Sequence, residues 1–220
     1  MLIVSLSLYV IAFFLSLLSY WNKVSKRIVF IPLLLAVLFY FLHLLFLSVP
    51  FGGFPYADIY SFVSLLGNTI IAILLGLSFK NPQLLRLFAL FSFAGFLFSL
   101  LILPSEASPY KNPLYTLHIV SALFSYTFAF FAGLSAVIRL LIEKSLKHKD
   151  FPNFSIPVDI LMSLEKTTFI LSFIFFTLTL IFGSLWTRTH FGQHWINDHK
   201  LIFTFLLWLY YALVSHLNLM

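Results

Sequence analysis

Long runs of apolar residues alternate with short polar segments along the whole chain. Seven runs approach the roughly 20 residues that a helix needs to cross a hydrocarbon core about 30 Å thick. Continuous runs of this kind differ from the alternating, roughly ten-residue strands of a membrane β-barrel. The pattern therefore predicts an all-α, polytopic membrane helix bundle in one domain over residues 1–220. The runs cover residues 2–20, 28–49, 61–79, 87–104, 114–142, 160–186 and 201–217.

The composition supports a membrane location. The chain has 61% hydrophobic and only 9% charged residues, with a mean hydropathy of +1.04, whereas a soluble domain has about 25% charged residues. So few polar side chains cannot cover a water-soluble surface. The first run resembles a signal peptide in length, but its positive residues, Lys23, Lys26 and Arg27, follow it. We therefore interpret it as a retained span.

The basic residues predict the orientation of the spans. Ten of the 13 Lys and Arg residues lie on one side of the predicted bundle, and the positive-inside rule makes that side cytoplasmic. The N-terminus is then expected outside and the C-terminus in the cytoplasm. Three loops are expected to face outward, at residues 50–60, 105–113 and 187–200. The ten residues are Lys23, Lys26, Arg27, Lys80, Arg86, Arg139, Lys144, Lys147, Lys149 and Lys166.

Several functional classes find no support in the sequence. The chain has no cysteine, which excludes disulfides, Cys-ligated zinc, iron–sulfur clusters and thiol catalysis. Its net charge of +6 is explained by topology signals, so nucleic acid is not an expected partner. No carboxylate pair, nucleophile–base pair or phosphate loop is evident, and the chain has no independent catalytic constellation. Seven histidines remain as the principal metal ligands.

The last outward loop carries three histidines and several aromatic residues. His190, His194 and His199 lie in it, together with Phe191, Gly192 and Trp195. Such a loop can present an aromatic shelf to a flat apolar ligand, because glycine lets the backbone turn. An ordinary interfacial aromatic belt explains the same residues, and on these grounds alone it is the favoured interpretation. A zinc site at His190 and His194 lacks a third ligand.

Three other histidines, His43, His118 and His216, lie inside predicted spans. Ionisable residues in a membrane usually face the bundle interior and indicate a functional site. A buried imidazole needs partners for its ring nitrogens, and an iron ion is one such partner. The alternative is a hydrogen bond to a neighbouring carbonyl, which would be favoured for one isolated histidine but not for three.

The three histidines are expected at two depths. His118 lies about four residues into its span and His43 about six residues below the outer end of its span, so both belong to the outer leaflet. His216 is roughly 20 Å deeper by the same arithmetic. His43 and His216 therefore cannot ligate one iron. Two ligand levels, or transfer of a ligand between them, fit these positions.

Helical spacing predicts which faces are packed. A stripe of small residues in the fifth span is expected to allow close helix contact, and His118 continues its face. In the last span, Trp208 and His216 share one face with Phe205, Leu209 and Ala212. Asp198 is expected to cap that helix, and Glu165 and Lys166 to pair or snorkel at the inner interface. The stripe comprises Ser121 or Ala122, Ser125, Ala129, Gly133 and Ala136.

Several segments together resemble one known family. They are Gly183 to Trp186, Phe191 to Lys200, Trp208 to Tyr211, His216, and Pro113 to Ser121 with Ser125 and Tyr126. These segments resemble the Trp-rich WWD motif and the upstream His-bearing span of the CcsA-type cytochrome c assembly proteins, including the HemX-like and YpjD-like members. The resemblance covers most of the chain and is strongest over residues 113–216.

The resemblance implies a function in c-type cytochrome biogenesis. It implies that the chain binds non-covalent, b-type haem and presents it to an apocytochrome c at the outer face, with a CcsB-type membrane partner. His118 and His216 would be axial ligands, with His43 as a third candidate. The haem platform would comprise Trp186, Phe191, Gly192, Trp195, Asp198 and Trp208. A bacterial inner membrane is the expected location, and the chain would be the membrane subunit of a cytochrome c haem lyase.

The sequence also departs from the family pattern. Phe191 and Asn197 stand where the WWD motif has tryptophans, and a second outer histidine after a further span is absent from this sequence. His190, His194 or His199 would then have to substitute, or a partner would supply a ligand. These departures favour the alternative of a HemX-like regulator or scaffold of haem biosynthesis without haem transfer. A small transporter is a third alternative, but broken helix pairs and buried charges are not evident.

Overall fold

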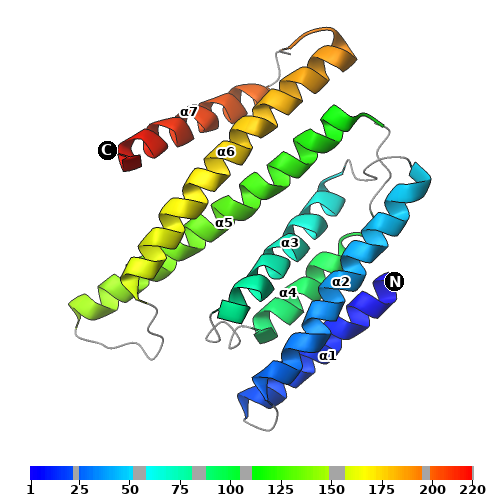
Figure 1. Cartoon of the computed structure of the whole chain (residues 1–220), viewed down its shortest axis with the longest axis vertical. Coiled ribbons are helices and arrows are strands. Elements are labelled where there is room, and N and C mark those ends of the chain that lie inside the picture. The colour runs from blue at the N-terminus through cyan, green and yellow to red at the C-terminus, as the bar shows by residue number, and fades with distance from the viewer. Residues whose placement is uncertain are drawn as a thin grey trace. The chain divides into compact units, whose positions relative to one another are not determined.

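The computed structural model describes residues 1–21, 25–51, 58–80, 88–104, 111–148, 157–194 and 199–219. All regular secondary structure in these ranges is α-helical (Figure 1). The seven predicted helices are therefore confirmed, and each lies close to its apolar run. They are α1 (Leu2–Tyr20), α2 (Lys26–Phe51), α3 (Ile59–Lys80), α4 (Phe88–Leu100), α5 (Pro113–Lys147), α6 (Val158–Phe191) and α7 (His199–Leu219).

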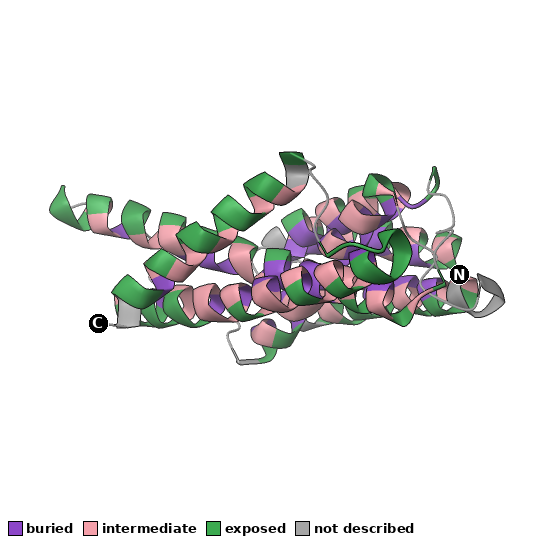
Figure 2. Ribbon diagram, turned by 90° about the horizontal axis from the view of Figure 1, so that it is seen from above, coloured by how far each residue is buried: buried purple, intermediate pink, exposed green. Residues whose placement is uncertain are grey.

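Five of the helices, α1, α2, α3, α5 and α6, are long and apolar enough to cross a membrane. Helices α4 and α7 contain shorter apolar segments, Phe88–Leu100 and Leu201–Leu217. Many large apolar side chains of the helices are exposed, and Figure 2 colours the exposed residues of each helix green. Because lipid solvates such side chains and water does not, the chain is an integral membrane helix bundle.

Some helix ends differ from the predicted spans. Helix α4 ends at Leu100, and a turn follows it in which the amide of Leu103 bonds to the carbonyl of Leu100. Helix α5 continues past the predicted end at residue 142 to Lys147, and α6 continues past residue 186 to Phe191. Hydropathy locates only the lipid-facing part of a helix, whereas backbone hydrogen bonding continues into polar segments.

The chain folds into two compact units. Unit 1 comprises Met1–Lys111 and unit 2 comprises Asn112–Met220. In unit 1, α1 packs against α2 and α4, while α3 packs against α4 and α2. Glycines permit two of these contacts, because a Cβ atom at Gly95 would overlap the Tyr9 ring and one at Gly67 would overlap the Phe98 ring.

A hydrogen-bonded network occupies the core of unit 1. The Tyr9 hydroxyl donates to Asn68 Oδ1 at 2.6 Å, and the Asn68 amide donates to the Ser64 carbonyl and to Ser99 Oγ. The Tyr40 hydroxyl lies 2.7 Å from Ser64 Oγ. All five residues have 0% exposure, so the network joins α1, α2, α3 and α4 away from lipid. Neutral polar groups are stable there because they form hydrogen bonds with one another.

Unit 2 is built on the antiparallel pair of α5 and α6, with α7 packed on α6 (Figure 1). Ser125 and Ser172 join α5 and α6 directly. The Ser125 hydroxyl donates to the Ser172 carbonyl at 3.2 Å, and the Ser172 hydroxyl donates to the Ser125 carbonyl at 3.0 Å. Such reciprocal bonds require the two backbones to approach closely, which small residues allow.

The small-residue stripe on α5 is only partly an interface. Ser121 and Ser125 bond to α6, as the stripe predicts. Gly133 is exposed, and a Cβ atom there would meet no atom within 4 Å. The prediction of close packing is therefore wrong at Gly133, because residue size alone does not identify the partner helix.

Candidate functional site

The start of α5 fixes the position of His118. The Asn112 side chain accepts a hydrogen bond from the amide of Leu114 at 2.8 Å, and Pro113 occupies the first helical position. Both features favour a helix that begins at this point. His118 therefore lies in the second turn of α5, where it faces α6.

The His118 imidazole packs directly on α6. Its Nδ1 lies 2.9 Å from the backbone carbonyl oxygen of Thr179, which is the hydrogen bond that the alternative to iron ligation predicts for one ring nitrogen. Because a carbonyl can only accept, Nδ1 carries the hydrogen, and in the neutral ring Nε2 then carries the lone pair. No residue in the described ranges hydrogen-bonds to Nε2, so His118 has one oriented ring nitrogen and one available for a ligand.

Gly183 provides the space for this imidazole. A Cβ atom at Gly183 would lie 2.9 Å from Nδ1 and 3.0 Å from Cε1 of His118. Both distances are shorter than an ordinary carbon contact of about 3.5–4.0 Å. A glycine inside an apolar helix is the signal by which the sequence indicates a close contact, but it does not identify the contacting residue.

Hydroxyl groups hold the backbone on both sides of the imidazole. Thr179 Oγ1 shares its hydrogen between Ser121 Oγ at 3.1 Å and the carbonyl of Phe175 at 2.8 Å, and Ser121 Oγ donates to the carbonyl of His118 at 3.0 Å. The side chain and backbone of Thr179 thus both contact the His118 turn. We call the contact group Ser121, Thr179 and Gly183 the His118 cradle.

Aromatic residues gather at the end of α6 nearest to His118. The Trp186 ring stacks on His190, with centroids 5.4 Å apart and planes at 10°, and it contacts the Phe191 ring edge to face. Tyr115 of α5 lies 5.4 Å from Trp186. Trp186 and Phe191, two predicted platform residues, are therefore brought together with one candidate ligand, His190.

The predicted loop at residues 187–200 begins later than expected. Residues up to Phe191 belong to α6, which ends at Gly192 with φ of 75°. This left-handed conformation suits glycine, and the Gly192 amide closes the helix on the carbonyl of Arg188 at 2.9 Å. The expectation that Gly192 turns the backbone is confirmed, whereas the loop assignment of residues 187–191 is wrong.

His194 returns to α6 after this turn. Its Nδ1 lies 3.1 Å from Ser184 Oγ. Ser184 follows Gly183, the residue that contacts His118, so the two imidazoles touch consecutive residues of α6. His199 begins α7 and is exposed. Trp195 and Asp198, predicted as a platform residue and a cap, lie outside the described residues.

Helix α7 contacts α6 through a face that includes Trp208, as predicted, but not His216. Trp208 donates from Nε1 to Thr177 Oγ1 at 2.9 Å, and Tyr211 stacks on Phe169 at 4.8 Å. Ser215 is buried, while His216 is exposed. The contact face therefore runs through residues 208, 211 and 215, one position away from the face that contains His216. Successive residues of a helix differ by only about 100° around its axis, so sequence spacing alone does not distinguish these two overlapping faces.

His118 and His216 lie at different levels of unit 2. His118 contacts residues 179 and 183 of α6, whereas Tyr211, more than a turn before His216, already reaches Phe169. About ten residues of helix, or roughly 15 Å, separate Thr179 from Phe169. His43 belongs to unit 1, half-buried in α2. The three histidines do not form one cluster within unit 2.

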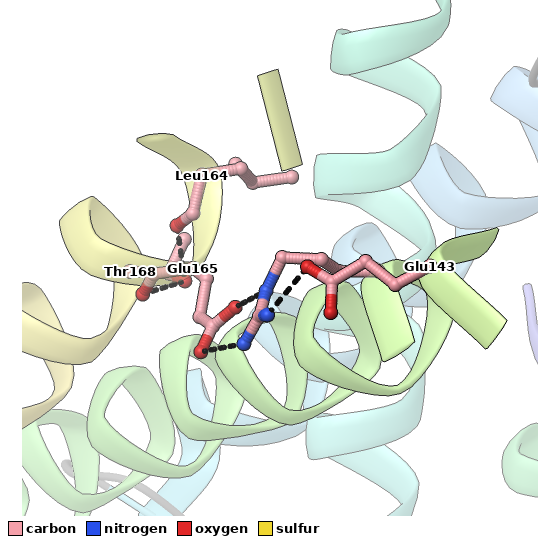
Figure 3. A network of polar contacts seen from close by, with 5 residues as sticks. Glu143, Leu164, Glu165 and Thr168 are labelled. Atoms are coloured by element: carbon pink, nitrogen blue, oxygen red, sulfur yellow. Dashed lines mark hydrogen bonds and ion pairs between the residues drawn. The ribbon is translucent and has the colours of Figure 1, made fainter. Parts of the chain in front are cut away.

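The opposite end of the α5–α6 pair carries an ion-pair group. Arg139 donates from Nε to Glu165 at 2.9 Å and from an Nη to the other Glu165 oxygen at 3.3 Å. A second Nη donates to Glu143 at 2.9 Å, and Figure 3 shows both carboxylates around the guanidinium. Of the two expectations for Glu165, pairing or snorkelling, the structure shows pairing: Glu165 binds Arg139 of the neighbouring helix, because the planar guanidinium offers two donors to one carboxylate.

No group of three His, Asp or Glu residues suited to a metal ion occurs within the described ranges. Iron in haem needs only one or two axial protein ligands, since the porphyrin supplies the other four. The donor set fits that requirement: a single neutral imidazole with a fixed tautomer lies beside an aromatic group.

The fold and this donor set define a polytopic helical membrane protein with an imidazole and an aromatic cluster at one end of a helix pair. The Cytochrome C assembly protein family matches residues 28–220, and the chain belongs to this family. Membership gives it a role in cytochrome c biogenesis and implies haem handling.

Two curated relatives are "Cytochrome c biogenesis protein CcsA" from different strains of Prochlorococcus marinus. The protein from strain MIT 9515 is 23% identical over 235 residues, covering 93% of this chain and 75% of the relative. The protein from strain SARG / CCMP1375 is 24% identical over 239 residues, covering 91% of this chain and 76% of the relative. No solved structure matches the chain significantly.

Proposed function

We propose that this chain binds non-covalent, b-type haem and presents it at the outer face of a bacterial inner membrane for attachment to an apocytochrome c. The observation that carries the proposal is the bond from His118 Nδ1 to the carbonyl of Thr179. It leaves Nε2 as a neutral ligand without further proton loss. Family membership supports the identity of the ligand as haem.

His118 is proposed as the axial ligand at the outer level. His194 is the best placed of the three outer histidines to complete the coordination, because it contacts Ser184 next to the His118 cradle. His190 is engaged with Trp186, and His199 begins the next helix. His216 remains a proposed ligand at the deeper level of unit 2. His43 remains a proposed ligand in unit 1.

The aromatic residues would support the flat porphyrin. Trp186 and Phe191 present ring faces and edges next to His118, and Trp208 is held on α6 by its bond to Thr177. Trp195, Gly192 and Asp198 complete the proposed platform. Haem supplies the iron and its redox chemistry, whereas these side chains bind it, orient it and exclude water.

Both units are proposed to act together as a single CcsA-like domain. The family match extends over parts of both units, which supports this assignment. The expected orientation places the N-terminus outside and the C-terminus in the cytoplasm. A CcsB-type membrane protein is the proposed partner, with which the chain would form the membrane part of a haem lyase.

One observation favours the alternative, a HemX-like regulator or scaffold that does not transfer haem. The His190 imidazole already covers one face of Trp186 at an angle of 10°. A porphyrin could use only the other face without displacing His190. The regulator hypothesis predicts a stable complex with a membrane partner and little bound haem.

Absorption spectra of the detergent-purified protein, oxidised and reduced, test the proposal. We expect a low-spin haem spectrum for the wild type, a large loss of it in His118→Ala, and a partial change in His194→Ala. His216→Ala and His43→Ala test the other levels. His148→Ala is the matched control, because His148 caps α5 at the opposite end and is exposed.

Two results would contradict the proposal. One is a colourless wild-type protein from cells supplied with a haem precursor. The other is an unchanged spectrum in His118→Ala. A colourless protein that copurifies with a membrane partner would favour the regulator.

A further inference from the structure

The His118 cradle does more than separate two helices. Ser121, Thr179 and Gly183 each make a defined contact with His118, and together they determine where its ring lies and which nitrogen is protonated. A helix pair could be held by the Ser125–Ser172 bonds alone, one to two turns away. The contacts around His118 are therefore not needed to hold the two helices together.

We infer that Gly183 and Thr179 are positioning residues, which hold the His118 imidazole with Nδ1 protonated and Nε2 presented to an iron ion. The inference rests on the proposed function. It goes beyond it, since it assigns a role to residues that contact neither iron nor porphyrin.

The tautomer of His118 is the first requirement. An unconstrained neutral imidazole exchanges between Nδ1–H and Nε2–H forms, and only the first offers a lone pair on Nε2. The Thr179 carbonyl selects this form because it accepts a hydrogen bond and cannot donate one. A hydrogen bond to the non-ligating nitrogen also raises the basicity of the ligating one.

The absence of a side chain at Gly183 is the second requirement. The ring can approach the Thr179 carbonyl to 2.9 Å only if position 183 carries no Cβ atom, which would be 2.9 Å from the same nitrogen. Alanine at this position would push the ring away and break the hydrogen bond. Position 183 thus controls the tautomer of a residue that lies on another helix, far earlier in the chain.

The hydroxyl of Thr179 is the third element. It contacts Ser121 Oγ as well as the Phe175 carbonyl of its own helix, so it links the turn of α6 that orients the ring to the His118 turn of α5. Removal of this hydroxyl leaves the Gly183 space intact. Thr179→Val therefore provides a second, milder variant for the case in which Gly183→Ala does not fold.

The experiment compares Gly183→Ala with Gly133→Ala in the full-length chain. Both substitutions add one methyl group to a helical glycine in unit 2, but Gly133 has no atom within 4 Å of the new Cβ. Nitrogen-15 NMR of histidine-labelled, haem-free protein gives the His118 tautomer, with the signal assigned by its absence in His118→Ala. Haem titration gives the affinity, and a redox titration gives the midpoint potential.

We expect Gly183→Ala to shift His118 away from the Nδ1–H form and to weaken haem binding by about tenfold to a hundredfold, as for other residues that orient a metal ligand. The midpoint potential should rise, because a less basic imidazole stabilises ferric iron less. Thr179→Val should change the same properties in the same direction but less. Gly133→Ala should match the wild type.

An unchanged tautomer in Gly183→Ala would overturn the inference, and so would a changed tautomer with unchanged haem affinity and potential. These results differ from failure of the proposed function. If His118→Ala binds haem as tightly as the wild type, His118 is not an iron ligand and both proposals fall. If His118→Ala loses haem and Gly183→Ala does not, only the positioning role is overturned.

Discussion

Units 1 and 2 are both built from apolar helices, but they use their polar side chains differently. In unit 1, Tyr9, Tyr40 and Asn68 are fully buried and bond to one another or to serines across four helices. In unit 2, the polar residues of α5 and α6 form separate contacts along the helix pair, and His118 is only half-buried. A network in which every polar group is hydrogen-bonded stabilises a bundle. A side chain with one unbonded nitrogen is available for a ligand.

Polar residues that hold a membrane bundle together thus differ from those available to a ligand in how many of their hydrogen-bonding groups are bonded within the protein. Burial alone would have placed the site in unit 1, where Tyr9, Tyr40 and Asn68 are fully buried. Hydrogen-bond capacity places the candidate ligand in unit 2, because one His118 nitrogen is engaged and the other is not bonded by any described residue. Substitutions in the two units test this difference, and the largest expected effect is in unit 1.

Asn68→Leu should have the largest effect, because Asn68 bonds to three partners in the core of unit 1. The substitution leaves the Tyr9 hydroxyl and the Ser99 hydroxyl buried without this partner. We expect a loss of about 3 kcal/mol in the free energy of unfolding. Denaturant titration in detergent measures it. Thr69→Val is the control, since Thr69 Oγ1 bonds only within α3; a similar loss there would contradict the network.

Gly95→Ala should destabilise unit 1 by about 2 kcal/mol, within the range for overpacked cores. The new methyl group would overlap the Tyr9 ring, which must move away from Asn68. Thermal unfolding in detergent measures the change. Gly76→Ala has open space around the new methyl group and should be neutral or slightly stabilising. Equal melting temperatures for the two variants would argue against this packing.

The Ser125–Ser172 pair predicts a coupling of about 1 kcal/mol between α5 and α6, near the upper range for hydrogen bonds in membranes. A double-mutant cycle with Ser125→Ala and Ser172→Ala measures it directly. Ser135→Ala with Ser172→Ala is a suitable control cycle, because Ser172 bonds to Ser125 and Ser135 lies almost three turns further along α5. Additive effects of the first pair would show that the reciprocal bonds contribute nothing.

Trp208→Phe should have the smallest effect, about 0.6 kcal/mol, because one hydrogen bond to Thr177 is lost while most ring contacts remain. Unfolding of α7 from α6 can be followed by limited proteolysis of the C-terminal segment. Thr177→Val removes the same bond from the other side and should give the same result. Different effects of the two substitutions would indicate that ring packing, rather than the bond, holds α7.

Much of the fold was predictable from the sequence. The seven helices follow from hydropathy, since each helix must satisfy its backbone bonds internally in lipid. Helix ends in polar segments were less predictable: α5 extends to Lys147 where Arg139 and Glu143 pair within the helix. The network of unit 1 was not predicted, although Tyr9, Tyr40 and Asn68 stand out as polar residues within apolar runs.

The candidate site was predictable in part. His118 could be selected as a polar residue on a small-residue face, and Gly192 as a residue that turns the backbone. The contact between His118 and Gly183 could not be derived, because it depends on the register of two helices that are distant in sequence. The exposure of His216 was not predicted for a related reason: a helix face is defined only to within one residue until its partner is known.

The length of α5 has a consequence for the depth of the site. Its 35 residues measure about 52 Å, and even a tilt of about 40° would leave roughly 10 Å outside a hydrocarbon core about 30 Å thick. The charged end around Arg139 and Glu165 is the part that lipid tails solvate least, so the ion pair belongs at the headgroup level. His118 precedes Arg139 by about 32 Å of helix. Anchoring one end of the pair thus sets the imidazole near the opposite boundary of the bilayer.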